Sequence, residues 1–234
     1  MANRGKKYRA ADEKVEKGKS YMLEEAVSIL KQIGIAKFDE TVELSANLGV
    51  DPRHVDQQVR GTVILPHGTG KEIKVLVLAR GEKEKEAQEA GADFIGADEF
   101  IPKIREGWMA VDVIIATPDL MGEVGKLGRI LGPKGLMPNP KSGTVTFDVG
   151  KAVKDVKAGK IEYRVDKGAN LHIPVGKMSF EQEKLLENIR VLLLEILRVK
   201  PSASKGKYIK SISLSPSMGP SIHLDTQQVI NALK

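Results

Sequence analysis

The chain has 234 residues, long enough for two domains with sizeable cores, and it carries a formal net charge of +6 with a pI of about 9.3. It has no cysteine, which excludes disulfide bonds, thiolate zinc sites and cysteine nucleophiles and fits a reducing cytoplasm. No apolar run approaches the roughly 20 residues that a membrane-spanning helix needs, and the N-terminus lacks the apolar core of a secretory signal.

The first part of the chain predicts a basic arm, one helix and two half-buried strands. Residues 1–20 are basic and partly helical in pattern. A helix is expected over 21–31, where apolar side chains recur at helical spacing, with Ser20 as its N-cap. Residues 41–48 alternate between apolar and polar, which is typical of a half-buried strand, and a second strand is expected over 58–65.

The middle of the chain has a different pattern. Residues 73–79 and 111–116 are nearly continuous apolar strands, and residues 94–95 form a short third one. Helical patterns lie between and after these strands, over 81–91, 98–106 and 120–130. Buried strands that alternate with helices indicate a parallel α/β sheet covered on both faces.

Alternating strands return near the C-terminus. They are expected over 161–166 and 171–175, joined by the turn KGAN, and over 208–215, followed by a short strand at 222–224. A long helix is expected to begin at Ser179, with Gln182 as its capping-box partner, and to stop at Pro201.

These patterns indicate one domain interrupted by another. Residues 1–67 plus 160–234 would form an α+β sandwich, and residues 68–159 an inserted α/β unit, with glycine-containing, hinge-like crossings at 66–70 and 157–161. Residues 1–67 hold eleven basic and ten acidic residues, 161–234 hold eleven and seven, and 68–160 hold fifteen and fourteen. A phosphate-bearing partner would therefore bind the split domain, although a charge of this size can also serve solubility alone.

The chain lacks the spacings of known catalytic and nucleotide-binding motifs. The segment GKLGRILGPKGLMPNPKSGT (125–144) suggests a phosphate cradle, but neither a P-loop nor a GxGxxG fingerprint is present. The four histidines lack metal-site spacing, and no serine lies in a GxSxG elbow. We therefore predict no catalytic residue, metal or cofactor. The alternative of an α/β enzyme acting on a nucleotide or small phosphate ester would require a phosphate loop or an acid–base pair.

Several strand ends and turns carry residues suited to folded RNA. They are Lys37 to Thr41, the segment with Arg164, Asp166, Lys167 and Gly168, the hydroxyl row Ser211, Ser213 and Ser215, the turn around Met218, and His172 as a phosphate or sugar contact. Hydroxyls can bond 2′-OH groups and phosphates, and small residues allow close approach to a shallow groove. The competing interpretation is that Phe38 is core, the serines are solvated, and the PSMGP turn is merely tight.

The segments KFDETVELSANLGVDPRHVDQQVRGTVILPHGTGK, LMGEVGKLGRILGPKGLMPNPKSGTV, DKGANLHIPVGKMSF and SPSMGPSI resemble the bacterial form of large-subunit ribosomal protein one, the L-one family. The resemblance implies a split RNA-binding domain with a Rossmann-like, three-layer domain inserted at a flexible hinge. It implies a cytoplasmic, ribosome-associated protein that binds large-subunit rRNA at the mobile side stalk, assists release of exit-site tRNA and represses translation of its own operon mRNA. No stable homo-oligomer is expected. A free-standing mRNA repressor remains an alternative.

The resemblance also implies which residues meet RNA. The family's RNA face corresponds to Lys37, Phe38, Glu40, Thr41, Asp166, Lys167, Gly168, His172, Ser217, Met218 and Gly219. The residue pattern adds Arg164, Ser211 and Ser213 to this face, and a basic loop with Lys126, Arg129, Lys134 and Lys141 is the expected tRNA contact. Two positions depart from the family's usual pattern: Ser217 replaces a threonine, and Pro216 replaces a serine.

Overall fold

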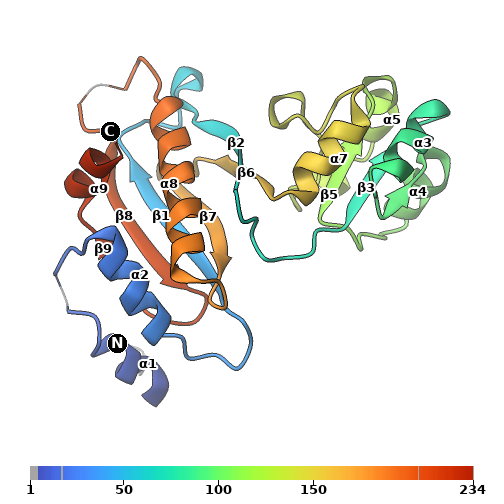
Figure 1. The fold of residues 1–234 in the computed structure, drawn as a ribbon. Coiled ribbons are helices and arrows are strands. Elements are labelled where there is room, and N and C mark those ends of the chain that lie inside the picture. Colours follow the sequence, from blue (N-terminus) through green and yellow to red (C-terminus); the bar gives the residue numbers. More distant parts are fainter. Residues whose placement is uncertain (1–4, 17, 205, 234) are drawn as a thin grey trace. The chain divides into compact units, whose positions relative to one another are not determined.

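The computed structural model describes residues 5–16, 18–204 and 206–233, in a mixed α/β arrangement with several sheets. The chain divides into two compact units (Figure 1). The first unit comprises Met1–Gly70 and Glu162–Lys234, and the second comprises Lys71–Ile161. Among the described residues, no helix combines the length and the apolar character needed to cross a membrane.

The first unit is built on a four-stranded antiparallel sheet. Its strand order is β7 (Asn170–Lys177), β1 (Thr41–Leu48), β8 (Ile209–Pro216) and β9 (Ile222–Leu224). The expected strand over 41–48 is confirmed, and burial alternates along its whole length. Period-two alternation leaves one face of the sheet apolar and covered, and the other face polar.

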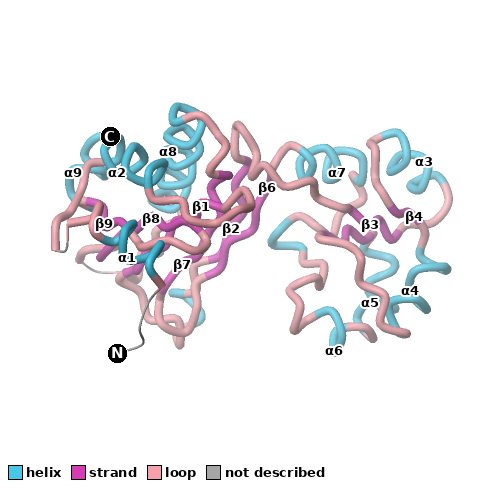
Figure 2. Tube along the Cα trace, turned by 90° about the horizontal axis from the view of Figure 1, so that it is seen from below, coloured by secondary structure: helices cyan, strands magenta, loops and turns pink. Residues whose placement is uncertain are grey.

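Helices cover the apolar face of this sheet, as Figure 2 shows from below. They are α2 (Leu23–Gln32), α8 (Gln182–Arg198) and α9 (Thr226–Ala232), whereas α1 (Lys6–Asp12) lies further toward the N-terminus. α8 buries Leu185, Ile189, Leu192, Leu193 and Ile196, an i, i+3, i+4 stripe that fits a helix packed on a sheet. α9 was not predicted; Asp225 caps it by accepting hydrogen bonds from the N–H groups of Gln227 and Gln228, at 2.9 and 3.1 Å.

Two predicted helix starts were wrong. α2 begins at Leu23 rather than Tyr21, and no side chain caps it. α8 begins at Gln182 rather than near Ser179. Ser179 bonds Asp39 instead: its N–H donates to Oδ1 at 3.0 Å and its hydroxyl to Oδ2 at 2.7 Å. A serine that has a tertiary partner is no longer available as a cap, which sequence spacing alone cannot reveal.

A separate two-stranded sheet pairs β2 (Arg60–Ile64) with β6 (Lys160–Arg164). A short 3₁₀ turn, η1 (Val55–Gln57), precedes it. The KGAN turn therefore links two different sheets, so β6 and β7 do not form a hairpin within one sheet.

The second unit contains a three-stranded parallel sheet in the order β4 (Phe94–Ile95), β3 (Val75–Leu78), β5 (Val113–Ala116). One face packs on α3 (Glu82–Glu89) and α7 (Val149–Lys157), and the other on α4 (Ala97–Arg105), η2 (Pro118–Leu120), α5 (Met121–Gly125) and α6 (Gly128–Leu131). Helices thus cover both faces. The single helix expected over 120–130 is instead two short helices, α5 and α6, that follow η2, and glycine at 122, 125 and 128 lowers its helical propensity. α7 was not predicted.

Candidate nucleic-acid interface

The uncovered face of the four-stranded sheet carries rows of polar side chains. Ser45 on β1 lies opposite His172 on β7 and Ser213 on β8, and Ser213 lies opposite His223 on β9. The Oγ of Ser45 and the Nδ1 of His172 are 3.1 Å apart. A parallel row places Asn47 between Asn170 and Ser211. The register therefore gathers hydroxyl, amide and imidazole groups from four strands on one surface, and these groups can bond 2′-OH and phosphate oxygens.

Sequence reasoning found only part of these rows. It singled out His172, Ser211 and Ser213 but not Ser45, Asn47 or His223 as contacts. The outward alternation of residues 41–48 was the available signal for the first two, because strand neighbours on the polar face share one surface. The position of His223 depends on the pairing of β9 with β8, which the sequence does not specify.

Two large apolar side chains stand exposed at one end of this sheet. Phe38, in the loop before β1, is 59% exposed, and Met218, in the turn after β8, is 56% exposed. Phe38 is therefore not core. We call these two side chains the apolar knobs. Exposed apolar side chains that lie at one end of a polar surface mark a candidate binding site.

Glu40 is the residue that fixes the knobs. It is only 2% exposed. Its Oε1 accepts hydrogen bonds from the N–H groups of Ile35 and Ala36, at 2.8 and 2.7 Å, and its Oε2 accepts one from Met218 N–H at 2.9 Å. Predicted as an RNA contact, Glu40 is instead buried, with both carboxylate oxygens used by the protein backbone. It ties the loop that carries Phe38 to the turn that carries Met218, and its role is positioning.

Ser217 and Thr41 also join the turn to β1. Thr41 N–H donates to the Ser217 hydroxyl at 3.0 Å, and that hydroxyl donates to the Thr41 carbonyl at 3.3 Å. The Nζ of Lys177 donates to the Thr41 hydroxyl at 2.8 Å. Replacing threonine by serine at 217 thus keeps the hydroxyl that these backbone bonds use.

Contacts within the protein explain why position 219 is a glycine. A Cβ at this position would come within 2.6 Å of Pro216 Cγ and 3.1 Å of the Ile33 carbonyl oxygen. The sequence interpretation assigned this glycine to close approach of RNA. The packing against Pro216 and Ile33 already requires it, so a side chain at 219 would disturb the turn before any RNA binds.

The turn between β6 and β7 presents Lys167 to solvent. Asp166 Oδ1 accepts hydrogen bonds from the N–H groups of Asn170 and Gly168, at 2.7 and 2.8 Å. These bonds, that from Asn170 first, hold the pKa of the Asp166 carboxyl below its usual range. Asp166 is thus a turn former whose carboxylate is already engaged, and Lys167 is exposed at the tip. Lys37 is likewise exposed beside Phe38.

Arg164 does not lie on any of the strands that carry the polar rows. It is exposed and belongs to β6, in the two-stranded sheet, rather than to any strand of the four-stranded sheet. Only Val165 separates it from Asp166 along the chain, so it would lie at the flank of this surface.

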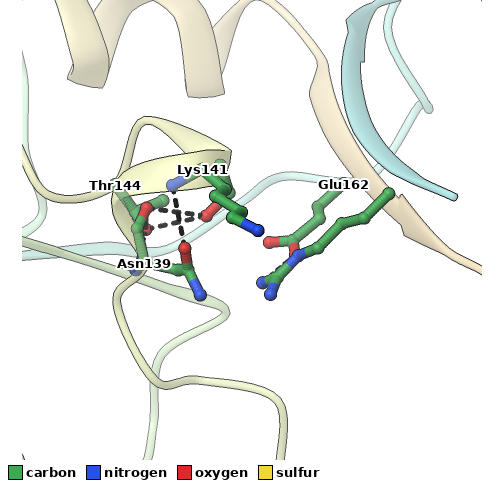
Figure 3. Close-up of polar contacts among 6 residues, drawn as sticks. Asn139, Lys141, Thr144 and Glu162 are labelled. Carbon is green, nitrogen blue, oxygen red and sulfur yellow. Dashed lines mark hydrogen bonds and ion pairs between the residues drawn. The ribbon is translucent and has the colours of Figure 1, made fainter. Parts of the chain in front are cut away.

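The second unit contains the basic loop that was expected to contact tRNA. Lys126, Arg129, Lys134 and Lys141 are all exposed. Lys141 lies in η3 (Pro140–Ser142), whose start is fixed by Asn139: the Asn139 side chain accepts from Lys141 N–H, and Asn139 N–H donates to the Thr144 hydroxyl, each at 2.8 Å (Figure 3). Ser142 Oγ adds a bond to the Asn139 carbonyl at 3.0 Å. The end of the loop that bears Lys141 is therefore conformationally defined.

The described part of the chain contains no group of three or more His, Asp or Glu side chains placed to hold a metal ion.

The model of the ribosomal protein L1p/L10e family matches residues 30–220. The match begins within α2 and takes in both apolar knobs, the 166–170 turn and three of the four strands of the large sheet. The chain belongs to the ribosomal protein L1p/L10e family, and it is a ribosomal protein that binds rRNA.

Proposed function

We propose that the polar face of the four-stranded sheet and the apolar knobs form the rRNA-binding surface, and that the rRNA is the side stalk of the large subunit. The observation that carries the proposal is the exposure of Phe38 and Met218 on a scaffold that Glu40 holds in place. A protein exposes and fixes such side chains at a cost, and a partner that covers them recovers the hydrophobic free energy.

The chemistry of this surface suits folded RNA better than duplex DNA. Its groups are mainly hydroxyls, amides and imidazoles rather than dense arginine and lysine, so it can bond 2′-OH groups as well as phosphates. The knobs can pack against ribose and base faces. Lys37 and Lys167, exposed on either side, supply phosphate contacts. Membership of a ribosomal protein family favours this function over the enzyme hypothesis.

The two units would divide the work. The first, discontinuous unit anchors the protein to rRNA, and the second, a Rossmann-like domain joined through glycine-containing crossings, moves at this hinge and assists release of exit-site tRNA. Lys126, Arg129, Lys134 and Lys141 are the side chains that would meet that tRNA. The same rRNA surface would also bind a similarly folded element in the protein's own operon mRNA and so repress its translation.

A salt titration of binding to a side-stalk rRNA fragment tests the surface. Met218→Ala should weaken binding by about 2 kcal/mol, roughly thirtyfold in Kd, with an unchanged salt slope, because a covered apolar contact is lost and no phosphate contact. Lys167→Ala should instead lower the slope of log affinity against log salt by about one unit.

Leu194→Ala is the matched control, because Leu194 is a comparably exposed apolar residue on α8, on the covered side of the sheet. It should bind as wild type does. If the folded Met218→Ala protein also binds as wild type does, the knobs do not contact RNA, and the proposed surface is wrong.

A further inference from the structure

The N-terminal arm, described over residues 5–16 and 18–19, precedes the segment that matches the family model. It contains α1, and Lys6 and Lys7 at the start of that helix are both exposed. The arm's function is therefore not supplied by the family match and has to be argued from its own contacts and charges.

The arm is attached to the first unit. Within α1, Ala11 is 4% exposed and Tyr8 is half-buried, so these two side chains, at i and i+3, face the protein. Val15, after the helix, is also half-buried. Lys14 Nζ donates to the Gln32 carbonyl at the C-terminal end of α2, at 2.9 Å. Glu16 N–H donates to the Tyr21 hydroxyl, also at 2.9 Å.

Tyr21 in turn is joined to the edge of the large sheet. Its N–H donates to the His223 carbonyl and its carbonyl accepts from Asp225 N–H, both at 2.9 Å. These bonds on both sides of Tyr21 add one residue to the edge of β9. The C-terminal end of the arm is therefore joined to the sheet that carries the polar rows.

Lys6 and Lys7 are exposed at the start of α1, and the first turn of this helix has no acidic residue. Arg9 is the basic residue of the last turn, and Asp12 ends the helix. Exposed lysines of this kind can bind the phosphate groups of a nucleic acid.

The arm lies at the end of the unit that bears the apolar knobs. Lys14 bonds Gln32, and the next residue, Ile33, has its carbonyl against Gly219, beside Met218. The loop with Phe38 follows from there. Figure 1 shows α1 beside the C-terminal end of α2, where this loop begins.

We infer that Lys6 and Lys7 bind the phosphodiester backbone of the same rRNA, on the flank of the segment that covers the knobs. This inference rests on the proposed function. The arm would add an electrostatic, sequence-independent contact to a primary site that has few cations, and so extend the footprint beyond the residues of the family match.

The test compares two double variants of the full chain that each remove two positive charges. Lys6→Gln with Lys7→Gln removes the proposed contacts, and Lys184→Gln with Lys200→Gln removes two exposed lysines, one in the first turn of α8 and one just after this helix. Binding to a side-stalk rRNA fragment with flanking duplex is measured between 50 and 300 mM salt, values on the order of those over which phosphate contacts are resolved. The first variant should lose about tenfold in affinity at the lowest salt and about 1.5 units of salt slope. The α8 variant should lose less than about twofold, and arginine at 6 and 7 should restore both quantities.

Equal losses in the two variants would mean a general charge effect and would overturn the inference, as would wild-type affinity and slope in the Lys6→Gln, Lys7→Gln protein. Protection of Lys6 and Lys7 from acetylation in the wild-type complex, read by mass spectrometry, supports the inference without any variant, and full reactivity overturns it. If the wild-type protein does not bind the fragment, the proposed function fails instead, so the two failures can be told apart.

Discussion

The Glu40 carboxylate accepts three backbone hydrogen bonds in a site almost closed to water. Glu40→Gln should destabilise the first unit by about 1–3 kcal/mol, because an amide replaces one acceptor oxygen by a donor that faces a backbone N–H. The free energy of unfolding from urea titration measures this loss. RNA affinity should fall as well, with an unchanged salt slope, because the knobs lose their fixed positions.

Glu183→Gln, an exposed change of the same kind on α8, provides the control and should change stability by less than about 0.5 kcal/mol. Equal stability of the two variants would show that the Glu40 bonds do not hold the loop and turn together.

At the residue scale, the sequence indicated some of the polar side chains on this surface but not what each one contacts. Strand alternation predicted the outward direction of Ser211 and Ser213, because it depends only on period two. Glu40 was assigned to RNA because the family resemblance placed it on the RNA face, in the segment just before the first strand. Its partners at 35, 36 and 218 come together only in the folded chain, and no local pattern indicates a carboxylate that is satisfied by distant backbone groups.

At the scale of elements, two tyrosines are buried: Tyr163 on β6 and Tyr208 immediately before β8. The hydroxyl groups of Tyr163 and Tyr208 have no hydrogen-bond partner among the described residues. Burial raises the pKa of each to about 12. The folded state thus favours the neutral phenol. The free energy of unfolding is therefore unaffected by these groups below the unfolded pKa of about 10, and it falls as pH rises from about 10 to 12.

We therefore expect a double Tyr163→Phe, Tyr208→Phe variant to lose less stability than wild type between pH 9 and 11. Urea unfolding at several pH values gives the comparison, and the difference between the two proteins removes the shared titration of lysines. At pH 8 the variant should be no less stable than wild type, since a phenylalanine buries no unpaired hydroxyl. If the free energy of unfolding falls equally with pH in the two proteins, the two phenols do not have the raised pKa that burial would give them.

Element types were better predicted than element ends. The strands at 41–48 and 94–95 were located to the residue because their patterns are unambiguous. The predicted cap at Ser179 was wrong because this serine bonds a tertiary partner, Asp39. The predicted cap at Ser20 was also wrong, since α2 begins at Leu23 with no side-chain cap. α7 was missed, although its residues Val149, Val153 and Val156 share one buried face.

At the scale of the whole molecule, every residue assigned to the rRNA surface belongs to the first unit. A chain in which a short glycine–serine linker replaces residues 71–161 should therefore fold and bind the side-stalk fragment within about tenfold of the full protein, since no phosphate or apolar contact of the proposed surface is removed. Fluorescence anisotropy with the labelled fragment measures this affinity, and circular dichroism verifies the fold. Binding by residues 71–161 alone, with none by the shortened chain, would place the rRNA surface in the other unit.

The contrast between half-exposed and continuous apolar strands predicted two kinds of sheet in this chain, and an antiparallel and a parallel sheet are present. A strand alternates between apolar and polar residues when one face of its sheet is buried, and it is continuously apolar when both faces are buried, so the strand sequence itself carries this information. The small β2–β6 sheet was not predicted, because the pairing of strands about a hundred residues apart leaves no local pattern.

The exposure of Met218 has a chemical consequence for the protein before it is assembled. A thioether open to solvent is oxidised by peroxide to a polar sulfoxide, whereas one pressed against RNA is shielded. Oxidation would make the Met218 side chain polar and remove the hydrophobic free energy that it gains when RNA covers it. Copies that wait too long without RNA would thus become unable to bind it, and those already bound would keep their thioether intact. Binding would protect the residue on which binding depends, and methionine sulfoxide reduction would return oxidised copies to the competent pool.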